Sequence, residues 1–290
     1  MTLRTLQIRP TNDCPATCGT CGDEASSEEM SVAAVAANLD HLCARYPIED
    51  IVLSGAGTVA RDDFPELLAL LHERRFRQVT LLGDGAHWTS HAVEAIAGVV
   101  HRVVIRLNPK LEARFVEGEW SDAQDWAGTV ADALRAIAEL RAAGLVVQTH
   151  TELRRGTVSV LPSLADAIDR LDVSAPTFAY PFASGPQDDV LPWPAIRAVV
   201  QDVLGRLRHR APRLKNVPVC ALGSLAAFAH RTQPRLYIKH DRQFENHAQI
   251  PPFVGLGYGS SCHGCAAIDQ CDGYWERHLK AGRIAPPTAL

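Results

Sequence analysis

The sequence predicts an α/β protein in which parallel strands are covered by helices. Six short apolar segments are each followed by a longer segment with apolar residues at helical spacing. The expected strands cover residues 5–9, 48–53, 78–82, 102–107, 145–151 and 177–180. The expected helices cover residues 31–45, 64–76, 90–100, 123–143, 161–171 and 194–209. This alternation is typical of a parallel sheet with helices outside, in which reactive groups lie at the carboxyl ends of the strands.

The composition fits a globular protein with one large domain and a small appendage. The chain has 290 residues and a net charge of −4, and its lysines and arginines are scattered along the sequence. We therefore expect no nucleic-acid partner and no binding to an anionic membrane surface. The first residues lack an apolar signal core, and no apolar run approaches the length of a membrane span, which predicts a cytoplasmic protein. In that reducing compartment, the eight cysteines are better suited to metal ligation than to disulfides.

The first cysteine group lies in the loop between the first expected strand and the first expected helix. Cys14, Cys18 and Cys21 fall close together, so three thiolates can converge on one metal centre. Three ligands leave one coordination position open, which a structural zinc site would fill and a catalytic iron–sulfur cluster needs empty. These residues alone leave both a zinc loop and an iron–sulfur cluster open.

A second cysteine group follows in the last quarter of the chain. Its members are Cys220, Cys262, Cys265 and Cys271. Four thiols with a CxxC core are typical of a closed site, for which zinc and a four-iron cluster are both chemically allowed. The remaining Cys43 shares the apolar face of the first helix with Leu39 and Leu42, which predicts a core residue.

The CxxxCxxC spacing of Cys14, Cys18 and Cys21 resembles the loop of the radical S-adenosylmethionine (radical SAM) superfamily. The resemblance implies a partial (β/α)6 barrel and a [4Fe–4S] cluster whose open iron binds S-adenosylmethionine. It also implies reductive cleavage of that cofactor to a 5′-deoxyadenosyl radical, which abstracts hydrogen from a substrate. An electron donor such as flavodoxin or ferredoxin is then an expected partner.

The segment after the second expected strand resembles the Gly-Gly-Glu-Pro element of the family. Gly55, Ala56, Gly57 and Thr58 stand at the matching positions, and the glutamate is absent. In the family, the main chain of this element receives the amino group of S-adenosylmethionine. A second departure is Thr20, which stands where the family usually has an aromatic residue near the adenine.

The end of the fourth expected strand carries a further pair of candidate cofactor contacts. Arg106 and Asn108 stand where the family often contacts the carboxylate and ribose of S-adenosylmethionine. A guanidinium suits a carboxylate because it can donate two parallel hydrogen bonds. Other polar residues are expected to point toward the mouth of the barrel as a group: Asp84, His87, His150, Glu152 and Tyr180.

The C-terminal cysteines resemble the auxiliary-cluster appendage of radical SAM enzymes of the twitch and SPASM groups. One four-cysteine site fits the shorter twitch type, so we expect a barrel in residues 1–212 and a twitch-like domain in residues 213–290. A second [4Fe–4S] cluster would accept an electron from the substrate radical or hold the substrate. The substrate is a peptide or a small metabolite, and the outcome an oxidation or bond formation in natural-product or cofactor biosynthesis. The alternative is a zinc-stabilised barrel that binds a ligand or partner without radical chemistry.

Overall fold

The computed structural model is built around a curved sheet. It describes residues 4–11, 29–85, 88–107, 129–181, 190–207, 210–232, 235–239, 242–244, 256–286, 288 and 290. The strand order along the sheet is β7-β6-β5-β4-β3-β2-β1-β8-β9. Neighbouring strands from β7 to β8 are parallel, and only β8 and β9 pair antiparallel. The predicted α/β class with a parallel sheet is therefore confirmed.

The strands of the sheet are β1 (Thr5–Arg9), β2 (Asp50–Leu53), β3 (Gln78–Gly83), β4 (Arg102–Arg106), β5 (Val146–Glu152), β6 (Pro176–Ala179), β7 (Arg213–Lys215), β8 (Leu236–Lys239) and β9 (Arg242–Phe244). The helices are α1 (Val32–Cys43), α2 (Phe64–Arg74), α3 (Ser90–Ile96), α4 (Thr129–Ala142), α5 (Arg155–Arg170), α6 (Trp193–Arg206), α7 (Val219–Leu222) and α8 (Glu276–Lys280). A short antiparallel pair, β10 (Leu256–Gly257) and β11 (Tyr274–Trp275), stands apart from the main sheet.

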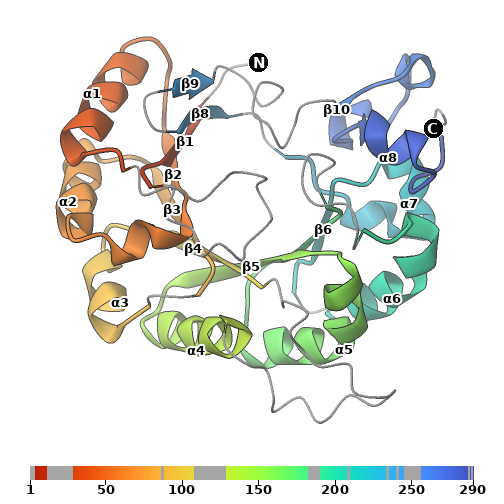
Figure 1. The fold of residues 1–290 in the computed structure, drawn as a ribbon, viewed down its shortest axis with the longest axis horizontal. Coiled ribbons are helices and arrows are strands. Elements are labelled where there is room, and N and C mark those ends of the chain that lie inside the picture. The colour runs from red at the N-terminus through yellow and green to blue at the C-terminus, as the bar shows by residue number, and fades with distance from the viewer. Residues whose placement is uncertain are drawn as a thin grey trace.

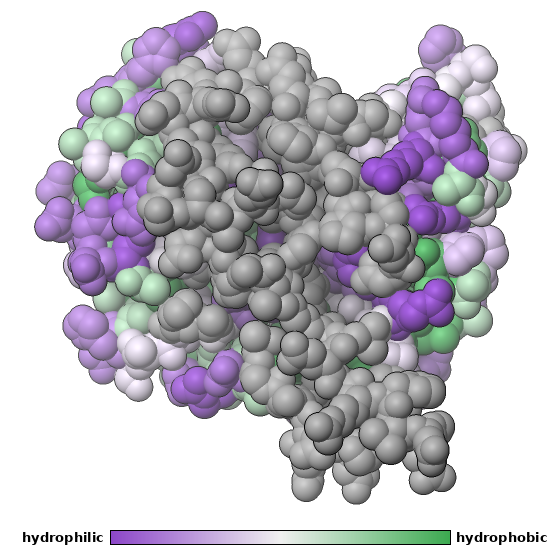
Figure 2. Space-filling model, viewed as in Figure 1, coloured by the Kyte–Doolittle hydropathy of each residue, from purple (hydrophilic) through white to green (hydrophobic). Residues whose placement is uncertain are grey.

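Helices α1 to α6 follow one another round the outside of the curved sheet (Figure 1). The core lies between these helices and the sheet, where Leu6 and Ile8 of β1 and Leu39 of α1 have no exposed surface. Burial of each such side chain contributes roughly 1.5–3 kcal/mol to folding. Hydrophilic residues are frequent on the outer surface over α1 and α2 (Figure 2). Within the described ranges, no helix is both long and apolar enough to cross a membrane.

The start of α5 and the position of Cys43 differ from the sequence prediction. Helix α5 begins at Arg155, six residues before the expected start, and contains Pro162. The buried stripe continues through this proline, because Leu161 and Leu164 face the core on either side of it. The prediction that Cys43 is a core residue is wrong, since Cys43 is exposed at the last position of α1.

The segment after residue 212 contributes strands to the main sheet. Strand β7 pairs with β6, and β8 pairs with β1 on the other side of the sheet. The short helix α7 follows β7, and β8 and β9 form an antiparallel hairpin. The expected division into residues 1–212 and 213–290 stays a prediction, with the second segment supplying parts of both the sheet and the cysteine-rich region.

Candidate functional site

The loop that carries the first cysteine group begins and ends beside the carboxyl end of β1. Four predicted residues of this loop lie outside the described part of the chain: Cys14, Cys18, Thr20 and Cys21. At its base, Thr11 and Glu29 form an antiparallel bridge. The N–H of Met30 donates to the carbonyl of Pro10 at 2.7 Å. The two ends of the cysteine loop are therefore held side by side.

The guanidinium of Arg61 forms hydrogen bonds to both ends of the loop. It donates to the main-chain carbonyls of Pro10 at 2.8 Å and Met30 at 2.9 Å. Two further hydrogen bonds of 2.7 Å go to the two carboxylate oxygens of Asp63. Arg61 is only 7% exposed, and its hydrogen bonds to Asp63 lower the pKa of that carboxyl group. The buried cation is thereby neutralised chiefly by Asp63, with the carboxylate of Glu29 3.8 Å away, while it fixes two main-chain segments.

The sequence analysis did not identify Arg61 as a site residue. Its partners are main-chain carbonyls, which every residue type has, so no pattern of residue types indicates them. The available signal was the Arg-x-Asp spacing of Arg61 and Asp63 directly after the glycine-containing segment.

The glycine-containing segment lies against the base of the cysteine loop. Gly55 has a φ of 112°, and a Cβ at this position would lie 2.9 Å from the carbonyl oxygen of Thr11. Both the backbone conformation and the close approach therefore require glycine. Ala56 and Gly57 begin the 3₁₀ helix η1 (Ala56–Ala60), and Arg61 directly follows it. The structure thus brings the predicted cofactor-binding segment and the base of the cysteine loop together.

The inner face of the sheet, opposite the helices, carries basic side chains from several strands. On β4, Val103 and Ile105 have no exposed surface and belong to the core. Because side chains alternate along a strand, Arg102 and Arg106 occupy the inner face. Arg106 stands in register with His150 of β5, at the carboxyl end of the strand as expected.

Strand β7 and the residue before β8 extend this basic surface. Leu214 is 2% exposed and packs in the core, so Arg213 and Lys215 occupy the inner face. Arg235 donates to the side-chain oxygen of Gln7 on β1 at 2.9 Å. We call Arg102, Arg213, Lys215 and Arg235 the inner cation group.

Burial and mutual repulsion shift the pKa values at this surface. Burial lowers the pKa of Lys215 to about 8, with the positive charge of Arg235 adding to the effect and Asp272 opposing it. Burial likewise lowers the pKa of His150 to about 3, and neighbouring basic side chains contribute. At neutral pH, Lys215 is therefore charged and His150 is neutral.

The other polar residues expected at the mouth of the barrel differ in where the structure places them. Two expected site residues lie outside the described part of the chain: His87 and Asn108. Glu152 is 1% exposed and bonds to Arg154 at 2.7 Å. The expectation that Tyr180 points to the mouth is wrong, because it is fully buried and its hydroxyl donates to the carbonyl of Leu191 at 2.7 Å. Burial raises the pKa of Tyr180.

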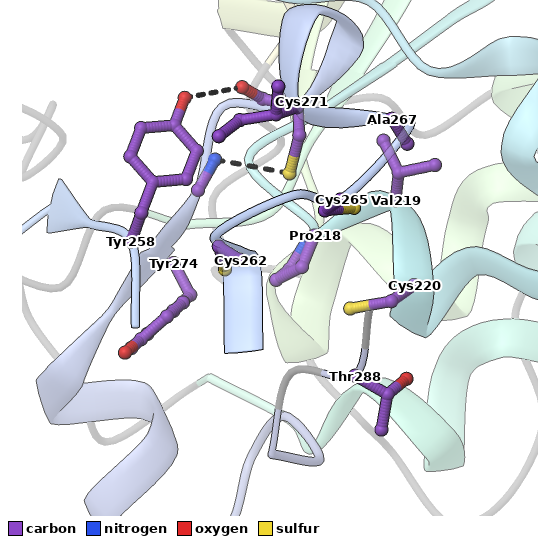
Figure 3. Close-up of a pocket in the computed structure, with 12 residues that line it drawn as sticks. Pro218, Val219, Cys220, Tyr258, Cys262, Cys265, Ala267, Cys271, Tyr274 and Thr288 are labelled. Atoms are coloured by element: carbon purple, nitrogen blue, oxygen red, sulfur yellow. Dashed lines mark hydrogen bonds between the residues drawn. The ribbon is translucent and has the colours of Figure 1, made fainter. Parts of the chain in front are cut away.

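The four C-terminal cysteines line one pocket (Figure 3). They are Cys220 in α7, Cys262 at the end of η5 (Ser260–Cys262), and Cys265 and Cys271 in the turns that follow. Apolar side chains, among them Pro218, Val219 and Ile268, complete the walls of a space of about 340 Å³ that opens to solvent.

The four described cysteines of this pocket are not gathered round a single point. Four thiolates on one zinc ion would lie within about 4 Å of one another, given Zn–S bonds of about 2.3 Å. Among the described residues, no three His, Cys, Asp or Glu side chains are placed to hold a metal ion. By its chemistry, a set of four thiols could ligate either zinc or an iron–sulfur cluster.

Main-chain groups fix the last cysteine of the pocket. The N–H of Gly273 donates to the sulfur of Cys271 at 3.3 Å, and the hydroxyl of Tyr258 donates to the Cys271 carbonyl at 2.7 Å. Burial raises the pKa of the Cys271 thiol, whereas the N–H groups of Val219 and Gly273 oppose this effect. Gly273 has a φ of 84°, and a Cβ there would lie 2.5 Å from the carbonyl oxygen of Gly257. This turn therefore requires glycine.

Asp272 ties the same turn to the carboxyl end of β7. Its carboxylate accepts from the N–H of Thr232 at 2.7 Å and from the N–H of Asn216 at 3.4 Å. Asn216 directly follows β7, and its side-chain amide donates to the carbonyl of Tyr180 at 2.9 Å. The cysteine pocket thus borders the same edge of the sheet as Lys215.

We expect Arg61→Met to lower the free energy of unfolding by about 3 kcal/mol, because it leaves two main-chain carbonyls and a carboxylate without their donor. Chemical denaturation of the cofactor-free protein measures this loss. The control is Arg135→Met, which removes an exposed pair with Asp132 on α4 and should cost less than about 1 kcal/mol. Equal losses in the two variants would contradict the role of Arg61.

We expect Lys215→Met to raise the free energy of unfolding by about 2 kcal/mol at pH 7, because it removes a charge whose burial is unfavourable. The folded protein releases the Lys215 proton near pH 8 and the unfolded chain near pH 10.4. The advantage of the variant should therefore shrink as the pH rises between these two values. Denaturation at pH 7 and pH 10 tests this, with the exposed Lys280→Met as control. A less stable Lys215→Met protein at pH 7 would refute the electrostatic argument.

The sequence and the structure were compared with those of known proteins. No family model matches the chain. A curated relative, the probable GTP 3',8-cyclase of Methanocella arvoryzae, is 37% identical over 84 residues, or 28% of this chain. The match spans only 27% of that protein's length.

Two solved structures cover nearly all of the chain. Streptococcus suis SuiB bound to S-adenosylmethionine has a TM-score of 0.63 and 11% identity, over 97% of this chain and 74% of that one. Native anSMEcpe with bound AdoMet has a TM-score of 0.65 and 11% identity, over 94% of this chain and 89% of that one. The chain therefore shares its fold with these two proteins, both of which were solved with S-adenosylmethionine bound.

Proposed function

We propose that this protein is a radical SAM enzyme that acts on a peptide or a small metabolite. One observation carries the proposal. The base of the CxxxCxxC loop lies against the Gly55 segment at the carboxyl ends of β1 and β2, and Arg61 bonds to both ends of the loop. Structures with the same fold support it, since SuiB has been solved with S-adenosylmethionine and with its precursor peptide SuiA.

In this proposal, a [4Fe–4S] cluster is held by Cys14, Cys18 and Cys21. When bound, it supplies one electron to S-adenosylmethionine, whose cleavage gives a 5′-deoxyadenosyl radical that abstracts hydrogen from the substrate. The residues proposed to bind S-adenosylmethionine are Gly55, Ala56, Gly57, Arg106 and Asn108. Arg61 acts as a positioning residue, because it fixes the cysteine loop against this segment.

We further propose that the second cysteine group holds a second [4Fe–4S] cluster. Four thiols lining one pocket, with main-chain N–H groups directed at the sulfur of Cys271, support this assignment. Full ligation by protein favours transfer of an electron from the substrate radical, which would lead to an oxidation or a new bond in natural-product or cofactor biosynthesis. An electron donor such as flavodoxin or ferredoxin would serve the first cluster.

The proposed activity predicts that anaerobically reconstituted protein, given reductant and S-adenosylmethionine, forms 5′-deoxyadenosine. A variant with Cys14, Cys18 and Cys21 changed to Ala should form none and should hold about half the iron, because only the second cluster remains. Iron analysis and chromatography of the products measure both quantities. Colourless, zinc-containing wild-type protein would overturn the proposal and favour a zinc-stabilised binding protein.

The second cluster makes a separate prediction for Cys265→Ala. This variant should lose about half the iron while it retains formation of 5′-deoxyadenosine, because the ligands of the first cluster are unchanged. The matched control is Cys43→Ala, which removes an exposed thiol outside both groups and should keep the full iron content. Wild-type iron in Cys265→Ala would show that the pocket binds no cluster.

A further inference from the structure

Within the part of the chain that the structure describes, the inner cation group has no acidic side chain as an ion-pair partner. Of the described residues, Arg102, Arg213 and Lys215 make no ion pair and no side-chain hydrogen bond, and Arg235 bonds only to the neutral side chain of Gln7. The Nε of Arg102 is buried without a hydrogen-bond partner. By contrast, the buried guanidinium of Arg61 pairs with Asp63.

The nearby carboxylates are already bound to other groups. Glu152 of β5 pairs with Arg154 at 2.7 Å. Asp272 accepts main-chain hydrogen bonds from Thr232 and Asn216, and it is the one acidic side chain whose charge raises the pKa of Lys215. Counting the described residues alone, the inner cation group therefore carries an excess of positive charge inside the curved sheet.

The members of this group lie near one another although their strands are far apart in sequence. Residues Arg106, His150, Thr177 and Arg213 form one register row across β4, β5, β6 and β7. Across the sheet, the charge of Arg102 lowers the pKa of Arg213, and that of Arg235 lowers the pKa of Lys215.

Neutral imidazoles accompany these cations. Burial, together with the charges of Lys215 and Arg213, lowers the pKa of His230 to about 4. With His150 also neutral, the surface offers further hydrogen-bonding groups without adding charge.

Like charges in a partly buried space repel one another and lose hydration, so the arrangement is unfavourable until an anion enters. S-adenosylmethionine brings one carboxylate, for which Arg106 on β4 is the proposed partner. Arg213 and Lys215 lie on β7 and Arg235 precedes β8, away from the Gly55 segment in the strand order. One carboxylate cannot balance the whole surface.

We propose that the substrate carries a phosphate or carboxylate group that binds to Arg213, Lys215 and Arg235 on the inner face of the sheet. This inference rests on the proposed function, because it names the chemical class of that enzyme's substrate. The oxyanion anchors the substrate at the side of the sheet that borders the cysteine pocket, where Asp272 meets the end of β7. Arginine and lysine are the side chains that best bind such oxyanions.

The test measures anion binding by the full-length reconstituted protein at low salt, without reductant. Inorganic pyrophosphate and succinate serve as probes for phosphate and carboxylate, and their affinities are obtained from saturable shifts in the melting temperature. We expect at least one probe to bind, and Lys215→Met and Arg213→Met each to weaken it by at least about tenfold. Lys280→Met, which removes an exposed lysine from α8, should bind the probe as the wild type does.

Each outcome of this experiment either supports or overturns the inference. Binding of pyrophosphate alone assigns a phosphate, binding of succinate alone assigns a carboxylate, and either result supports the inference when both inner-face variants lose it. The inference is overturned if neither probe binds, or if Lys215→Met binds the probe as tightly as the wild type does. Displacement of the probe by S-adenosylmethionine also overturns it, because the cations then belong to that cofactor. Since no radical chemistry is involved, failure to form 5′-deoxyadenosine would refute the proposed function and leave anion binding to be judged separately.

Discussion

The hydrogen bonds of Arg61 are the constraint on which the first half of the candidate site depends. One buried guanidinium bonds to the main chain at both ends of the cysteine loop, and it directly follows the segment that begins at Gly55. The cysteine loop and the glycine-containing segment therefore share one fixed point. The carboxylate of Asp63 compensates the buried positive charge of Arg61. Without such a partner, a guanidinium at this depth would be strongly unfavourable.

A carboxylate performs the corresponding task for the second cysteine group. Asp272 bonds to main-chain N–H groups after β7 and η2 (Gly223–Phe228), and so fixes the turn that carries Cys271 to the sheet. Each cysteine group is thus attached to a strand end through one charged side chain that bonds to main chain. Because the strands between them belong to one continuous sheet, the sheet sets the separation between the base of the cysteine loop and the turn that carries Cys271.

The parts of the fold that depend on local pattern could be predicted from the sequence, as the strand before the first cysteine loop and the helix after it show. Contacts that depend on tertiary packing could not. The sheet membership of β7 was missed because three residues with two basic side chains do not read as a strand. Cys43 was misplaced because it lies at the edge of a narrow apolar stripe, where Leu42 takes the inward position. Arg61 was missed because its partners are carbonyl groups, which every residue has.

The net charge of the chain also conceals its local electrostatics. A value of −4 with dispersed lysines and arginines gives no sign of a basic surface. Folding nevertheless collects Arg102, Arg213 and Lys215 on one face, while the acids of the same region bond elsewhere. Alternation along the strands explains the result, since each apolar residue that faces the helices leaves its neighbours facing inward. Repulsion among these cations reduces stability, and such a cost is typical of sites that are organised to bind a ligand of opposite charge.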